Sequence, residues 1–148
     1  MNKIRITKEF KFEMAHALMG YNGPCRNIHG HSYCLYVTVI GSPVCDDNSP
    51  VNGMVMDFNE LKNIIKNEIT DKLDHALVLS DKTPASILNS LKEFDNVILL
   101  PYQPTCENML ADFAARIQKH LPSNIKLFSL KLCETVTSSA EWFAEDNR

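Results

Sequence analysis

Three histidines in the first quarter of the chain have the residue type and spacing of a catalytic metal site. His29 and His31 flank Gly30, and the alternation of side chains along a strand would put both imidazoles on one face. His16 ends an earlier apolar segment and would lie opposite them if the two segments pair as a hairpin. Three imidazoles suit zinc and leave its fourth tetrahedral position open for water or substrate. Spacing alone also allows three unrelated histidines.

Other reactive side chains lie near these histidines in the sequence. Cys25 precedes His29 by four residues, where a nearby cation would favour the thiolate, a proton-abstracting base. An inert packed thiol is the alternative. Asp74 and His75 follow a predicted helix, whose carboxyl end favours an imidazolium or is simply solvated. Adjacency in sequence does not make these two residues a hydrogen-bonded pair.

Apolar periodicity predicts the elements that would position these residues. Apolar side chains on even positions over 4–14 predict a strand that runs into His16, and a turn-rich loop leads to a second strand over 33–40. Asp57 begins a capping box, and apolar residues at helical spacing predict a helix over 58–73.

The second half of the chain predicts another helix and two more strands. Thr105 has the residue type of an N-cap for an amphipathic helix that Pro122 ends. Strands are expected over 125–134 and 140–144, joined by a short segment of turn composition.

The segment between the two helices is the least regular part of the chain. We expect a short helix over 84–94 and a short strand or packed loop over 97–100. The main order is therefore β-β-α-α-β-β. This order implies an α+β fold, an antiparallel sheet with helices on one face.

Composition limits the class of protein. A chain of 148 residues, 45% of them hydrophobic, is expected to form one domain over 1–148. A net charge of −3 without a basic run predicts neither a nucleic-acid nor a membrane partner, so a small molecule is expected. The absence of a long apolar stretch and of a signal peptide favours a cytoplasmic protein. Its five cysteines lack CxxC spacing and are expected to remain thiols.

Six motifs, in order across nearly the whole chain, resemble those of the 6-pyruvoyl-tetrahydropterin synthase family. They are Phe12-Glu-Met-Ala-His16, Cys25-Arg-Asn-Ile-His29-Gly-His31, Asp57-Phe58, Leu73-Asp-His75, Pro104-Thr-Cys-Glu107-Asn108 and Cys133-Glu134-Thr135. The set is far more specific than any one of its members. The resemblance implies the tunnelling fold, in which three subunits join their sheets into a barrel and two trimers stack into a hexamer.

The resemblance also assigns roles to residues. It implies Zn²⁺ bound by His16, His29 and His31, with Cys25 as the base and with Asp74 and His75 as a proton relay from a neighbouring subunit. Glu134 would anchor the pterin, because a carboxylate can accept two parallel N–H bonds from its amino group and ring nitrogen. Thr105 and Glu107 occupy the other pterin-contact motif, although an N-cap and a first-turn acid explain them equally well.

The implied substrate is 7,8-dihydroneopterin triphosphate. We expect 6-carboxy-5,6,7,8-tetrahydropterin, acetaldehyde and triphosphate as products, as in queuosine biosynthesis, because the end of the chain from Glu134 resembles bacterial enzymes of that type. One alternative is triphosphate elimination to 6-pyruvoyl-tetrahydropterin. Two others are a zinc-binding module without catalysis and a thiol enzyme that uses Cys106, whose pKa could fall at a helix start.

Overall fold

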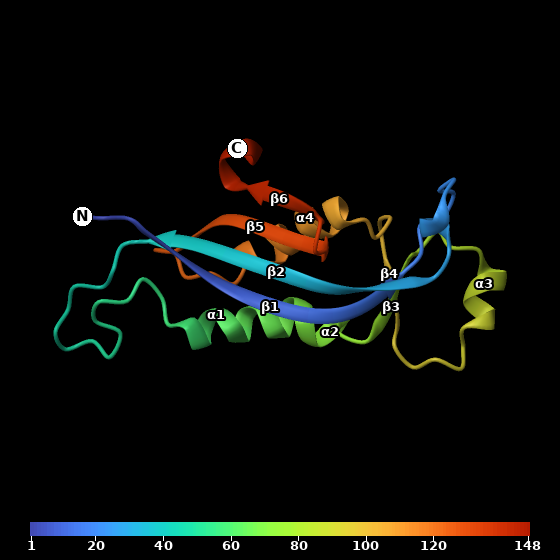
Figure 1. Ribbon diagram of the computed structural model, residues 1–148. Coiled ribbons are helices and arrows are strands. Elements are labelled where there is room, and N and C mark those ends of the chain that lie inside the picture. Colours follow the sequence, from blue (N-terminus) through green and yellow to red (C-terminus); the bar gives the residue numbers. More distant parts are fainter.

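A long antiparallel hairpin is the centre of the fold in the computed structural model, which describes all residues from 1 to 148 (Figure 1). Strand β1 (Ile4–His16) pairs along its whole length with β2 (His29–Gly41). Buried apolar side chains alternate with exposed polar ones along β1, as predicted for a half-buried strand. Strand β2 begins earlier than predicted and therefore includes His29 and His31.

Four shorter strands complete a six-stranded sheet of order β4-β3-β1-β2-β5-β6. On one side β5 (Lys126–Thr135) and β6 (Ser138–Phe143) continue the antiparallel pairing and confirm two predicted strands. On the other side β3 (Ala76–Ser80) pairs with β1, and β4 (Val97–Leu100) pairs with β3, both in parallel.

The prediction of a wholly antiparallel sheet is wrong at the β3–β4 edge. Strand β3 was missed because its five residues follow a helix directly and show too short a pattern. It is parallel to β1 because the preceding helical segment carries the chain back across the sheet, the kind of crossover that parallel neighbours require. The rest of the predicted α+β architecture is confirmed.

The helices also lie close to their predicted positions. The predicted helix over 58–73 is a continuous segment, in which a π-helical turn separates α1 from α2. Helix α4 ends a few residues before Pro122, and α3 lies within the predicted 84–94. The helical elements are η1 (Pro24–Arg26), α1 (Phe58–Ile65), η2 (Lys66–Thr70), α2 (Asp71–Leu73), α3 (Ala85–Ser90), α4 (Cys106–Gln118) and η3 (Ala144–Asn147).

The main helices cover one face of the sheet and enclose a single core. In Figure 1, α1 and α2 run alongside β1, and α4 lies behind β5 and β6. Leu61 and Phe113 from the helices pack in the same buried cluster as Phe12, Tyr33 and Leu35 from the hairpin. Burial of each such side chain contributes about 1.5–3 kcal/mol. None of the helices has both the length and the apolar character of a membrane span.

Candidate metal centre

The three predicted histidines meet at the end of the hairpin. His16 lies directly opposite His29 in the β1–β2 register, and His31 lies opposite Met14. Directly opposed residues of an antiparallel pair share a face, and this face is the helix-covered one. The ring centroid of His16 lies 4.6 Å from that of His29 and 5.2 Å from that of His31, and the latter two are 4.9 Å apart. The possible ligand atoms of the three residues lie within 4.8 Å of one another. Strand pairing therefore assembles a group that could hold a metal ion.

Backbone carbonyls orient two of the three rings. Nδ1 of His16 lies 2.7 Å from the carbonyl oxygen of Pro104, and Nδ1 of His29 lies 2.7 Å from that of Asn27. A carbonyl oxygen only accepts hydrogen bonds, so each Nδ1 donates and each Nε2 carries a lone pair. Such contacts are the outer-shell partners that metal-ligating histidines usually have.

The two Nε2 atoms then face each other at 3.0 Å. Two lone pairs at this distance repel, and a proton or a cation between the nitrogens removes the repulsion. Burial lowers the pKa of His16, and the neighbouring His29 and His31 lower it further. Burial also lowers the pKa of His31. The neutral, metal-binding form of His16 and His31 is therefore favoured near pH 7, and the donor set of three imidazoles fits a metal ion.

Glu134 lies at the edge of this group. Its Oε1 is 3.6 Å from Nε2 of His16 and 3.6 Å from Nε2 of His31, and the Tyr33 hydroxyl donates to the same oxygen at 3.4 Å. Tyr33 is buried and stacks on Phe12 with ring centroids 5.1 Å apart. Burial and the Glu134 carboxylate both raise the pKa of this phenol, which therefore stays protonated as a donor. Sequence reasoning missed Tyr33, because it resembles any other core position of β2.

Cys25 lies in the loop that joins two of the histidines. It belongs to η1 (Pro24–Arg26), a single turn between His16 at the end of β1 and His29 at the start of β2. Its thiol is partly exposed and unpaired, and its carbonyl accepts a hydrogen bond from the amide of Leu18 at 2.9 Å. The loop thus places a reachable thiol between two candidate metal ligands in the sequence.

Asp74 and His75 form a hydrogen-bonded pair outside the histidine group. Nδ1 of His75 lies 3.0 Å from Oδ2 of Asp74, and the amide of Glu13 donates to Oδ1 of Asp74 at 2.8 Å. The Glu13 hydrogen bond and the His75 contact lower the pKa of the Asp74 carboxyl. His75 has a positive φ of 60°, an uncommon conformation for a residue other than glycine, and its side chain is 79% exposed. It shares an open pocket with His31.

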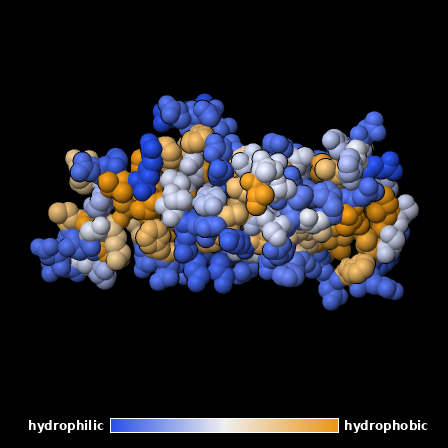
Figure 2. Space-filling view, in the orientation of Figure 1, coloured by the Kyte–Doolittle hydropathy of each residue, from blue (hydrophilic) through white to orange (hydrophobic).

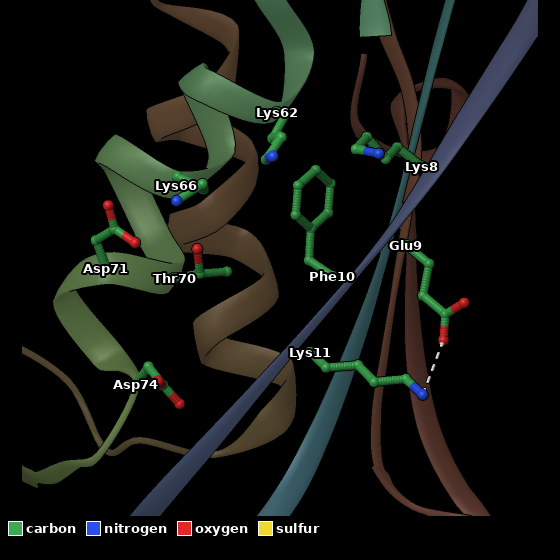
Figure 3. Close-up of a pocket in the computed structure, with 9 residues that line it drawn as sticks. All are labelled: Lys8, Glu9, Phe10, Lys11, Lys62, Lys66, Thr70, Asp71 and Asp74. Atoms are coloured by element: carbon green, nitrogen blue, oxygen red, sulfur yellow. Dashed lines mark ion pairs between the residues drawn. The ribbon is translucent and has the colours of Figure 1, made fainter. Parts of the chain in front are cut away.

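A second pocket places lysines beside Asp74. Figure 3 shows Lys62 and Lys66 on the α1–η2 segment, across the pocket from Phe10 of β1, with Asp74 at the lower end. The pocket, of about 360 Å³, is lined by four lysines and three carboxylates, so its net charge is only +1. The near balance of charge gives this pocket no strong preference for an anion.

Comparison with known proteins agrees with this arrangement. A model of the 6-pyruvoyl tetrahydropterin synthase family matches residues 5–145. The chain belongs to this family.

Curated relatives in the family match over nearly their whole length. The chain is 35% identical to a 6-carboxy-5,6,7,8-tetrahydropterin synthase of Haemophilus influenzae, over 93% of this chain and 97% of that relative. A protein of the same name from Aquifex aeolicus is 29% identical over 97% and 99%. The chain is therefore an enzyme of the pterin-synthase type.

Solved structures agree on the fold. The 6-pyruvoyl tetrahydropterin synthase of Caenorhabditis elegans superposes with a TM-score of 0.69 at 22% identity, covering 97% of both chains. An uncharacterized protein of Wolinella succinogenes superposes with a TM-score of 0.73 at 18% identity, covering 97% of this chain and 99% of that one. The expected subunit architecture of the tunnelling fold is thus confirmed.

The other pterin-synthase motif lies at the start of α4, next to the histidines. Thr105 is the N-cap, since its hydroxyl accepts from the amide of Asn108 at 3.2 Å, and Glu107 is an exposed acid in the first turn. These are the structural roles that the residue types alone suggested. Pro104, in the same segment, supplies the carbonyl oxygen that orients His16. The segment that begins α4 therefore also positions one member of the histidine group.

Cys106 does not fit a thiol enzyme. It is 7% exposed, and its Sγ donates to the carbonyl oxygen of Leu132 at 3.3 Å. Burial, with a further contribution from the Glu134 carboxylate, raises the pKa of this thiol to about 12. The hypothesis that a helix start makes Cys106 reactive is therefore wrong, because loss of hydration outweighs the helix dipole.

Proposed function

We propose that this protein uses Zn²⁺ to convert 7,8-dihydroneopterin triphosphate to 6-carboxy-5,6,7,8-tetrahydropterin, acetaldehyde and triphosphate, as in queuosine biosynthesis. The observation that carries the proposal is the full-length likeness to curated relatives named 6-carboxy-5,6,7,8-tetrahydropterin synthase. The three-histidine group supports it, because it supplies the donors that such chemistry requires.

The residues of the group fit zinc by chemistry as well as by position. His16, His29 and His31 would hold the ion through nitrogen atoms, the usual donors of a catalytic zinc site with an open fourth position. When bound, Zn²⁺ polarises the side-chain oxygens of the substrate and so acidifies the adjacent C–H bonds.

Cys25 and the Asp74–His75 pair are proposed to move protons. Cys25 removes a proton from the substrate side chain. His75, held by Asp74, then transfers protons between the substrate and the solvent. The His75 side chain is exposed and does not belong to the group of His16, His29 and His31 in its own chain. Both features support a relay in which His75 reaches the site of a neighbouring subunit.

Glu134, Thr105 and Glu107 are proposed to bind the pterin ring. The Glu134 carboxylate is held by Tyr33 near the histidines, so a ring anchored there would present its side chain to the metal. Two parallel N–H bonds to one carboxylate would also fix the orientation of the ring.

We further propose that the chain assembles as a dimer of trimers. Strand β1 pairs with β3 only at Met14–His16, which leaves the edge over 4–13 without a neighbour, and β6 is the opposite sheet edge. Unpaired edges of this length favour pairing with another chain. Figure 2 shows apolar surface gathered at the two ends of the molecule, and the exposed apolar residues include Phe94 and Leu99 near β4.

The product distinguishes this function from its alternatives. The purified zinc protein should be incubated with 7,8-dihydroneopterin triphosphate, with acetaldehyde and pterin products measured together. Stoichiometric acetaldehyde with the 6-carboxy product supports the proposal. A 6-pyruvoyl product without acetaldehyde would establish the triphosphate-eliminating reaction instead, and zinc binding without turnover would leave a binding module.

A further inference from the structure

The side chain of Gln103 ties the loop that carries Cys25 to the segment that begins α4. Within the loop, the Leu18 amide donates to the carbonyl of Cys25 at 2.9 Å, and further turn bonds join its own residues. Side-chain hydrogen bonds between the loop over 17–28 and the rest of the protein come from Gln103, which bonds to Met19, and from Nδ1 of His29, which donates to the Asn27 carbonyl at 2.7 Å. The loop contains Gly20 with a positive φ of 76°, a residue that gives an untied loop additional freedom.

Gln103 binds the loop with both ends of its amide. Its Oε1 accepts from the Met19 amide at 3.2 Å, and its Nε2 donates to the Met19 carbonyl at 2.8 Å. This pair of bonds resembles one rung of a β-ladder and fixes both the position and the orientation of the Met19 peptide groups. Met19 is adjacent to Leu18, whose amide holds Cys25.

Gln103 is itself held by the start of α4. Its carbonyl oxygen accepts from the Thr105 amide at 2.8 Å and from Nδ2 of Asn108 at 3.0 Å. The next residue, Pro104, supplies the carbonyl that orients His16. The start of α4 therefore positions both the Cys25 loop and the candidate metal ligand His16.

We infer that Gln103 is a positioning residue, which holds Cys25 at a set place relative to the three histidines. Its hydrogen bonds go to neither the thiol nor the imidazoles, so it acts through Met19 and Leu18. The inference rests on the proposed role of Cys25 as the base, because proton transfer requires placement within hydrogen-bond reach of the substrate.

The test replaces Gln103 with alanine and compares it with Gln118→Ala. Gln118 is the other glutamine of the chain and lies exposed at the far end of α4. Loss of two hydrogen bonds should shift the loop toward open states by about tenfold or more. We expect Gln103→Ala to lower kcat by roughly that factor with little change in KM or bound zinc. We expect Gln118→Ala to match the parent protein.

A second readout does not depend on the substrate. Iodoacetamide labelling of Cys25, followed by mass spectrometry with exposed Cys45 as the internal reference, should be faster in Gln103→Ala. If the proposed reaction is wrong, the parent protein does not form the 6-carboxy product and acetaldehyde, yet the labelling difference persists. Equal labelling rates in the two proteins would overturn the inference about Gln103 alone.

Two outcomes guard against a general structural effect. Gln103→Glu keeps the size of the side chain and the acceptor for the Met19 amide but loses the donor, so it should change kcat and labelling in the same direction while remaining folded. If Gln103→Ala loses zinc in proportion to activity, Gln103 acts on His16 through Pro104, and positioning of Cys25 is refuted.

Discussion

Cys25 and Cys106 should respond to substitution in opposite ways. Cys25 is a partly exposed residue of a short turn, whereas Cys106 is buried in the core and bonded to Leu132. If Cys25 is the base, Cys25→Ala should lower the turnover rate by about 10²- to 10⁴-fold, the usual contribution of such a group. Bound zinc should be unchanged, because the three histidines remain in place.

Cys106→Ala should instead reduce stability. The substitution removes a buried sulfur and its hydrogen bond, a loss of about 1 kcal/mol in the free energy of unfolding. For a chain of this length that corresponds to a fall in Tm of about 3–4 °C. Turnover should stay close to that of the parent protein, since the protonated, buried thiol has no access to a substrate.

The assay combines three measurements on each variant: pre-steady-state turnover of dihydroneopterin triphosphate, zinc content by elemental analysis, and thermal unfolding. A third variant, Cys45→Ala, controls for the loss of any exposed thiol. The reasoning is refuted if Cys106→Ala abolishes turnover with zinc retained, or if Cys25→Ala turns over at the parent rate.

Further predictions concern the metal, pH and the helix cap. Removing metal with a chelator should lower Tm, and added Zn²⁺ should restore it for the parent protein but not for His16→Ala, because a ligand stabilises only the state that binds it. The stability of the metal-free protein should fall as pH drops below about 6.5: the pKa values of His16 and His31 are lowered in the folded state, so the unfolded chain takes up protons first. Urea titrations from pH 8 to pH 5 measure this slope, and a flat profile would contradict it. Thr105→Ala should destabilise the protein by about 1 kcal/mol, whereas Thr105→Ser, which keeps the capping hydroxyl, should have a much smaller effect.

Much of the hairpin and the helix boundaries could be predicted because their signals are local. Apolar alternation along β1 predicted the face on which His16 lies, and the two-residue spacing of His29 and His31 placed both on one side of β2. Asp57 caps α1, as its residue type and position predicted. These features depend on neighbours within a few residues, so the order of amino acids alone determines them.

Contacts between distant segments were decided by the tertiary structure. The Met19 and Gln103 contact spans 84 residues, and Tyr33 meets Glu134 across 101. Burial made Cys106 unreactive although its place at a helix start suggested the opposite. Strand β3 joined the sheet in parallel only because a helix returned the chain there. None of these outcomes has a periodic signature, since each depends on how the helices pack against the sheet and on which polar groups that packing removes from water. The amino-acid order determined the chemistry that the three histidines can perform, and the packing determined which side chains surround them.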